Sequence, residues 1–184
     1  MTAVSLLAIC GSTRKASLNR ALLGAIGEVL PEGAVMTMWE GLEGLPIFNS
    51  DLQEPPSVIH LKSAITAVDG VIISVPEYNY SIPGGLKNAL DWVSRPPATS
   101  PMRGKPVGIV GAATGMSGTI RAQNHLRQMF VYSDTPVLNQ PEVLIPRAQE
   151  RFVDGKLADE STRQLLVRFA SAMVAHVRRY KLLG

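Results

Sequence analysis

The sequence has few of the residues that several common classes of protein require. Cys10 is the only cysteine among 184 residues, so an intramolecular disulfide framework is excluded. No stretch of about 20 apolar residues is free of charge, and a membrane span is therefore not expected. Aromatic residues make up 5% of the chain and long runs of like charge are missing, which disfavours a surface that stacks on nucleic-acid bases.

The remaining composition is typical of a globular protein with one core. Hydrophobic residues make up 46% of the chain, and the length fits a single domain over residues 1–184. The formal net charge of +3 suits anionic small molecules or nucleic acid, but a slightly basic protein without such a ligand is the better explanation. The segment Met1–Cys10 lacks the basic stretch and cleavage site of a secretory signal. We therefore expect a cytoplasmic protein that binds neither nucleic acid nor membrane.

Hydrophobic patterning predicts strands that alternate with helices. Short continuous apolar runs such as Ser5–Cys10 and Val71–Val75 indicate strands that are covered on both faces. The segments between such runs carry apolar residues at helical spacing. The expected strands are 5–10, 34–39, 71–75, 107–112 and part of 137–145, and the expected helices are 18–30, 57–67, 86–93, 119–131 and 159–182.

This alternation predicts an α/β fold, because neighbouring parallel strands need crossover connections. Right-handed crossovers place helices on both faces of the sheet. A flavodoxin-like three-layer sandwich with a five-stranded parallel sheet matches the number of elements. Ligands in such sheets bind outside the carboxyl ends of the strands, near the reversal in strand order. The loops after the first, third and fourth strands are therefore the candidate site.

The loop after the first strand, Gly11–Asn19, has the features of a phosphate site. A helix N-terminus presents unpaired N–H groups and a partial positive charge. Ser12 and Ser17 add hydroxyl groups, Arg14 adds a planar charged fork, and Asn19 adds an amide in the first helical turn. The alternative is that Ser17 only caps the helix and Arg14 is only solvated. Neither a glycine-rich dinucleotide fingerprint nor a P-loop pattern is present.

The two other loops suit a flat ligand. Segment Pro76–Asn88 carries tyrosines, whose rings and hydroxyl groups can contact a ligand, and prolines, which lower the cost of ordering the loop. Segment Ala113–Thr119 is rich in glycine and allows close approach to the backbone. The alternatives are a stiff loop at a subunit contact and a tight turn. Together, the three loops predict a phosphorylated planar ligand such as FMN.

The same loops resemble those of the NADPH-dependent FMN reductase family, which includes bacterial chromate and quinone reductases and some azoreductases. The similar segments are GSTRKASLNR at 11–20, LPIFNSD at 45–51, PEYNYSIPGGLKNALDW at 76–92 and AATGMSGTIRAQNHLRQ at 112–128. The resemblance covers about residues 4–145. It implies a flavodoxin-like fold, bound FMN, and a homodimer or homotetramer.

The resemblance also implies a set of FMN-binding residues. Those for the phosphate are Ser12, Arg14, Ser17 and Asn19; those along the ribityl chain and isoalloxazine are Pro76, Glu77, Tyr78 and Asn79; those beneath the ring are Thr114, Gly115 and Gly118. Family members often have serine or glycine where Thr114, Met116 and Ser117 stand, so the contacts of this loop differ in detail.

We therefore expect an oxidoreductase in which NADPH or NADH delivers a hydride to FMN N5. The electrons then pass to a small-molecule acceptor: a quinone, another flavin, an azo compound or a metal oxyanion such as chromate. No catalytic side chain and no metal site is assigned, and the choice between NADPH and NADH stays open. The alternatives are a flavodoxin-type electron carrier without NAD(P)H activity and a nucleotide-binding regulator without redox chemistry. Flavodoxins are typically acidic, whereas this chain is basic.

Overall fold

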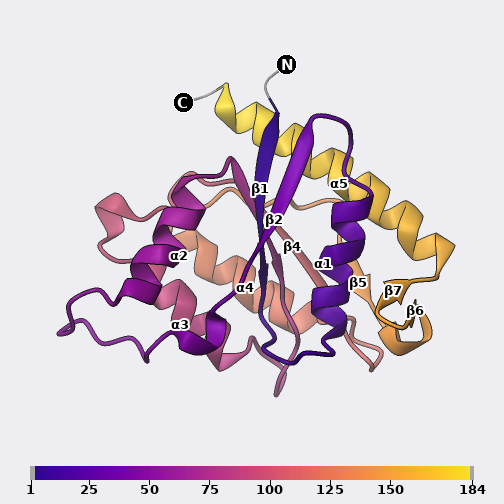
Figure 1. Cartoon of the computed structure of the whole chain (residues 1–184), viewed down its shortest axis with the longest axis horizontal. Helices are drawn as coiled ribbons and strands as arrows, with labels where there is room; N and C mark the ends of the chain where they lie inside the picture. Colours follow the sequence, from indigo (N-terminus) through magenta and orange to yellow (C-terminus); the bar gives the residue numbers. More distant parts are fainter. Residues whose placement is uncertain (1–2, 183–184) are drawn as a thin grey trace.

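The structure, a computed structural model, describes residues 3–182 and contains one central parallel sheet (Figure 1). The spatial order of its five strands is β2-β1-β3-β4-β5, so the order reverses between β1 and β3. This arrangement confirms the flavodoxin-like sheet expected from the sequence. The strands are β1 (Val4–Cys10), β2 (Ala34–Trp39), β3 (Gly70–Ser74), β4 (Val107–Ala112) and β5 (Val143–Ile145).

Helices cover both faces of the sheet (Figure 1). One apolar core joins the sheet to α1 (Leu18–Glu28) and α5 (Glu160–Lys181). A second core on the opposite face joins it to three further helices, α2 (Pro56–Thr66), α3 (Gly84–Val93) and α4 (Ile120–Tyr132). Successive residues of β1 alternate between the two cores, which explains why its sequence is apolar without interruption.

Helix α5 packs directly on the backbone of the central strands. A Cβ atom placed on Gly70 would lie 2.7 Å from Val177 Cγ2, and one on Gly108 would lie 2.8 Å from Phe169 Cζ. Both distances are shorter than real side chains allow, so glycine is required at both positions for the helix to approach this closely. Within residues 3–182, no helix combines the length and the apolar character that crossing a bilayer would need.

The structure adds short elements that patterning did not predict. Residues Phe152–Val153 (β6) and Lys156–Leu157 (β7) form a small antiparallel hairpin before α5. The last strand is also shorter than the expected segment 137–145, because only residues 143–145 join the ladder with β4. Pro141 lies just before it and has no backbone N–H group to donate to a neighbouring strand.

Candidate functional site

The first and second candidate loops touch at the carboxyl edge of the sheet. The N–H group of Gly11 donates to the carbonyl oxygen of Ser74 at 2.8 Å. A Cβ atom on Gly11 would lie 3.0 Å from Pro76 Cδ, so the two loops leave no room for a larger residue there. The hydroxyl oxygens of Ser12 and Tyr78 are 3.4 Å apart. The expected phosphate loop and the expected ring loop are therefore in direct contact.

The buried side chain of Asn19 links α1 to both central strands. Its Oδ1 accepts hydrogen bonds from Ser74 Oγ at 2.8 Å and from the N–H of Ala112 at 3.0 Å. Its Nδ2 donates to the carbonyl oxygen of Ala112 at 2.9 Å. These bonds align the ends of β3 and β4 with the start of α1. The side chain of Asn19 thus has a positioning role, and the phosphate contact expected from the sequence stays a prediction.

The other residues of the first loop differ in what they offer to a ligand. Ser17 is buried and caps α1, because its Oγ accepts from the N–H of Arg20 at 3.3 Å. The Oγ of Ser12 is also buried and lies 3.4 Å from the N–H of Arg14. The side chain of Arg14 is exposed and forms no ion pair within residues 3–182. Arg14 is therefore a free cation of this loop, as is the neighbouring exposed Lys15, but only Arg14 offers a planar guanidinium.

The second loop forms a tight turn at its tip. The backbone groups of Tyr78 and Ser81 exchange hydrogen bonds of 2.9 and 3.0 Å. The two central residues, Asn79 and Tyr80, have φ angles of +50° and +66°, which is the left-handed region that a type I′ turn requires. Such a backbone disfavours a tyrosine. The turn is held by α4, where His125 Nδ1 lies 2.9 Å from Ser81 Oγ.

The side chain of Glu77, in the second loop, binds the start of α4. Its carboxylate accepts from Arg121 Nη1 at 2.6 Å and from the N–H groups of Arg121 and Ala122 at 3.0 and 3.5 Å. Burial alone would raise the pKa of Glu77, but these hydrogen bonds and the charge of Arg121 outweigh it and lower the pKa below the usual value. The side chain of Glu77 therefore anchors the second loop to α4, and the expected ribityl contact of this residue stays a prediction.

The third loop is open at its first residues and closely packed at its last. Thr114 and Gly115 are exposed, and a Cβ atom on Gly115 would meet nothing within 4 Å. Gly118, by contrast, is buried with φ +55°, and its Cβ would lie 3.0 Å from the backbone of Leu144. Gly118 therefore serves packing against β5, whereas Thr114 and Gly115 remain free to face a ligand. Met116, which follows Gly115, is 70% exposed at the same loop.

These residues fit FMN. The N-terminus of α1 with Ser12 and Arg14 provides donors for a phosphate. The half-exposed Tyr78 and the open backbone at Gly115 provide surfaces for a flat ring. Contacts of the phosphate and the ring with individual side chains stay predictions.

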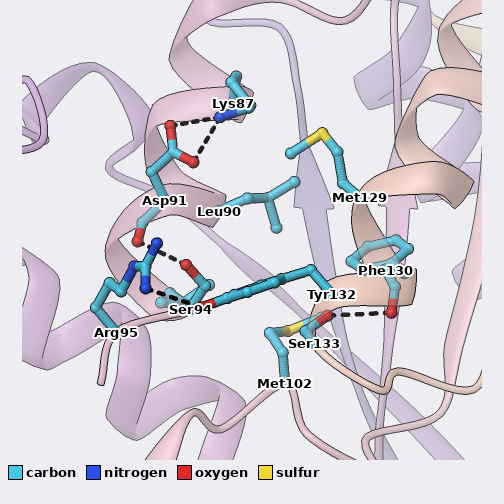
Figure 2. Close-up of a pocket in the computed structure, with 11 residues that line it drawn as sticks. Lys87, Leu90, Asp91, Ser94, Arg95, Met102, Met129, Phe130, Tyr132 and Ser133 are labelled. Carbon is cyan, nitrogen blue, oxygen red and sulfur yellow. Dashed lines mark hydrogen bonds and ion pairs between the residues drawn. The ribbon is translucent and has the colours of Figure 1, made fainter. Parts of the chain in front are cut away.

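A cleft of about 250 Å³ lies between α3 and α4 (Figure 2). Met102, Met129 and Phe130 contribute apolar surface to it. At its rim, Arg95 Nη1 donates to the hydroxyl of Tyr132 at 2.8 Å, and its guanidinium carbon lies 5.3 Å from the centre of the ring. No motif marks this cleft in the sequence, because its residues come from α3, α4 and the connection between α3 and β4.

The chain is similar to known flavin-dependent reductases over nearly its whole length. An NAD(P)H-dependent FMN reductase of Pseudomonas aeruginosa is 41% identical over 182 residues, which cover 97% of both chains. A 2-hydroxy-1,4-benzoquinone reductase of a Burkholderia species is 37% identical, over 96% of this chain and 97% of its own. The solved structure of FerB, a flavoenzyme NAD(P)H:(acceptor) oxidoreductase from Paracoccus denitrificans, superposes with a TM-score of 0.87 at 32% identity, covering 96% of this chain and 98% of that one.

The family match extends over residues 4–150, which include all three loops. It confirms the oxidoreductase class, and it confirms FMN and NAD(P)H as the cofactors expected from the sequence. On the match and on these identities, the chain belongs to the NADPH-dependent FMN reductase family.

Proposed function

We propose that this protein is a reductase that holds FMN at the carboxyl edge of its sheet and transfers electrons from NAD(P)H to a quinone. The observation that carries the proposal is the contact between the first two loops at Ser12 and Tyr78, beside an open third loop. When bound, FMN supplies a flavin ring that accepts a hydride from the nucleotide and passes electrons to the acceptor.

The residues of the chain have separate tasks in this proposal. Ser12 and Arg14 bind the phosphate, with the first turn of α1 contributing N–H donors. Tyr78, Asn79 and Gly115 border the ring and leave one face open to the nicotinamide and then to the acceptor. Asn19 and Glu77 position these loops without touching the reacting atoms.

We assign no acidic side chain to proton transfer. Glu77 is the only carboxylate of the second loop, and its hydrogen bonds lower its pKa. It is therefore ionised at neutral pH, and its oxygens already accept bonds from the start of α4. The protons that a reduced quinone takes up come from solvent through the open face of the site.

A quinone is the acceptor that the relatives support best. Relatives named 2-hydroxy-1,4-benzoquinone reductase and, in Escherichia coli (strain K12), quinone reductase are 37% and 36% identical to this chain. A quinone is also flat, so it can stack on the same open face as the nicotinamide. Free flavins, azo compounds and chromate are the competing acceptors, and each can be measured directly.

We also propose that the protein works as a homodimer or homotetramer in the cytoplasm, where NAD(P)H is generated. Large apolar side chains are exposed along α4 and on the adjoining second loop. Val131 is 81% exposed, Tyr80 67% and Tyr132 59%. Several large exposed apolar side chains on neighbouring elements favour a contact between proteins, and a second copy of the chain would cover them. Sedimentation that shows only monomer at micromolar concentration would contradict this part of the proposal.

The decisive experiment is an absorbance spectrum of protein loaded with FMN and freed of excess, before and after anaerobic addition of NADPH or NADH. A bound flavin band that bleaches supports the reductase. A bound band that neither nucleotide bleaches indicates an electron carrier instead, and the absence of a bound band contradicts the FMN site. Turnover with benzoquinone, FMN, an azo dye and chromate then ranks the acceptors, and a rate for benzoquinone below the others would overturn the quinone assignment.

A further inference from the structure

Arg147 lies at the same edge of the sheet as the three loops, just beyond the end of β5. Its N–H group donates to the carbonyl oxygen of Gly115 at 3.1 Å, and the N–H of Ala148 donates to that of Ala113 at 2.9 Å. Its φ angle of +45° places an arginine in the left-handed region. Two hydrogen bonds to the third loop therefore hold Arg147 in a backbone conformation that residues other than glycine seldom adopt.

The side chain of Arg147 is exposed and extends along the rim of the third loop. Its Nε lies 3.2 Å from the sulfur of Met116, which is itself 70% exposed. Within the described residues, no carboxylate lies close enough to form an ion pair with it. A neutral thioether orients the guanidinium but leaves its charge uncompensated.

The other arginines near this edge are already engaged. Arg20 is paired with Glu40, and Arg121 is paired with Glu77. Arg14, in the loop after β1, is assigned to the FMN phosphate. The strand order puts β5 at the far end of the sheet from that loop, with β3 and β4 between. Arg147 thus provides an unpaired guanidinium beside β5, whereas the proposed phosphate loop follows β1 on the other side of the flavin site.

We infer that Arg147 binds the 2′-phosphate of NADPH and makes NADPH the preferred electron donor over NADH. This inference rests on the proposed function, since a nicotinamide stacked on the open ring face must direct its adenosine half across the rim of the site. NADPH and NADH differ only in the phosphate on the adenosine ribose. A planar guanidinium with no competing carboxylate matches a dianionic phosphate in charge and in geometry. Met116 acts as the positioning residue.

Steady-state kinetics of FMN-loaded Arg147→Met test this assignment. We expect the KM for NADPH to rise about tenfold, which corresponds to about 1.4 kcal/mol, with kcat and the KM for NADH changed less than about twofold. Arg147→Lys retains a charge without the planar fork. Its KM for NADPH should lie between that of the unaltered protein and that of Arg147→Met. Arg179→Met, which removes an exposed arginine from the far end of α5, is the matched control and should behave as the unaltered protein. An equal rise in the KM for NADPH and in the KM for NADH would overturn the 2′-phosphate assignment.

A binding measurement separates this inference from the proposed function. Calorimetry with 2′,5′-ADP and 5′-AMP on FMN-loaded protein should show about tenfold tighter binding of 2′,5′-ADP, and Arg147→Met should abolish that difference. Methionine adopts the same left-handed backbone at the same cost, so the thermal melting temperature should stay unchanged. If neither nucleotide bleaches the flavin, the proposed function fails, while the ADP measurement still reports on Arg147. Equal binding of both probes by the unaltered protein would overturn the inference.

Discussion

The guanidinium of Arg121 lies over the ring of Tyr80, with its central carbon 4.0 Å from the ring centroid. The same guanidinium is paired with Glu77 at 2.6 Å. One side chain of α4 therefore contacts both the beginning and the tip of the second loop. Since Tyr80 has an unfavourable φ of +66°, these contacts compensate part of the strain in the turn beside the proposed ring site.

Replacing Arg121 with methionine should loosen the second loop. The variant loses the ion pair with Glu77, whose side chain is only 8% exposed and would be left without its charged partner. It also loses the stacking on Tyr80. We expect the free energy of unfolding to fall by about 1–3 kcal/mol, measured by urea denaturation. FMN affinity, measured by quenching of flavin fluorescence, should fall as well. Arg121→Lys keeps the charge but loses the planar stacking. Its free energy of unfolding and its FMN affinity should therefore lie between those of Arg121→Met and of the unaltered protein.

The pKa of Glu77 predicts how this anchor depends on pH. Its folded-state pKa lies below the unfolded value, so its contribution to stability is complete above the ordinary glutamate pKa of about 4.3. The contribution is lost as the pH falls from there through the lower folded-state pKa. The difference in free energy of unfolding between the unaltered protein and Glu77→Gln should therefore be constant between about pH 6 and 7 and shrink below about pH 4. A difference that grows in acid would contradict this assignment.

Arg14→Ala tests the phosphate end of the site. Loss of a charged hydrogen bond to phosphate should weaken FMN binding by about 1.5–3 kcal/mol, measured by calorimetry. The free energy of unfolding without FMN should change by less than about 0.5 kcal/mol, because the side chain is exposed and unpaired. Lys15→Ala removes the same charge from the same loop and serves as the control, with a much smaller expected effect. Unchanged FMN affinity in Arg14→Ala would remove the phosphate assignment.

The arrangement of strands and helices was predictable because the apolar pattern within each segment depends on which of its faces are buried. The β1 sequence shows no alternation because both faces of this strand are buried. The meeting of the three loops followed from the rule that ligands bind at the carboxyl ends of parallel strands. Both predictions depend on patterns within a segment and on general topology, and neither depends on a particular side-chain contact.

The roles of individual polar residues were harder to predict because they depend on partners far apart in the sequence. The amide of Asn19 bonds to Ala112 of β4, more than ninety residues later, and to Ser74 of β3, and neither contact can be read from the first loop alone. Glu77 similarly finds its partner on α4, 44 positions away. Arg147 lies outside every recognisable motif, and only the fold brings it beside Met116.

Asn19→Ala should affect stability more than Arg14→Ala does. The alanine leaves Ser74 Oγ, which is fully buried, and the N–H of Ala112 without their shared acceptor. Each unsatisfied buried group costs about 1–3 kcal/mol, so the free energy of unfolding should fall by at least about 2 kcal/mol. Urea denaturation without FMN measures this loss. A stability equal to that of Arg14→Ala, together with an equal loss of FMN affinity, would instead favour a direct phosphate contact for Asn19.

The third loop can be tested by enlarging its exposed glycine. A Cβ atom on Gly115 would meet no protein atom within 4 Å, so we expect Gly115→Val to leave the melting temperature of the FMN-free protein within a few degrees of the original. If the ring lies against this backbone, the added side chain occupies its space, and FMN affinity should fall at least tenfold. Gly24→Ala, also free of neighbours but on α1, should change neither quantity appreciably. Full FMN affinity in a folded Gly115→Val protein would place the ring elsewhere along this edge.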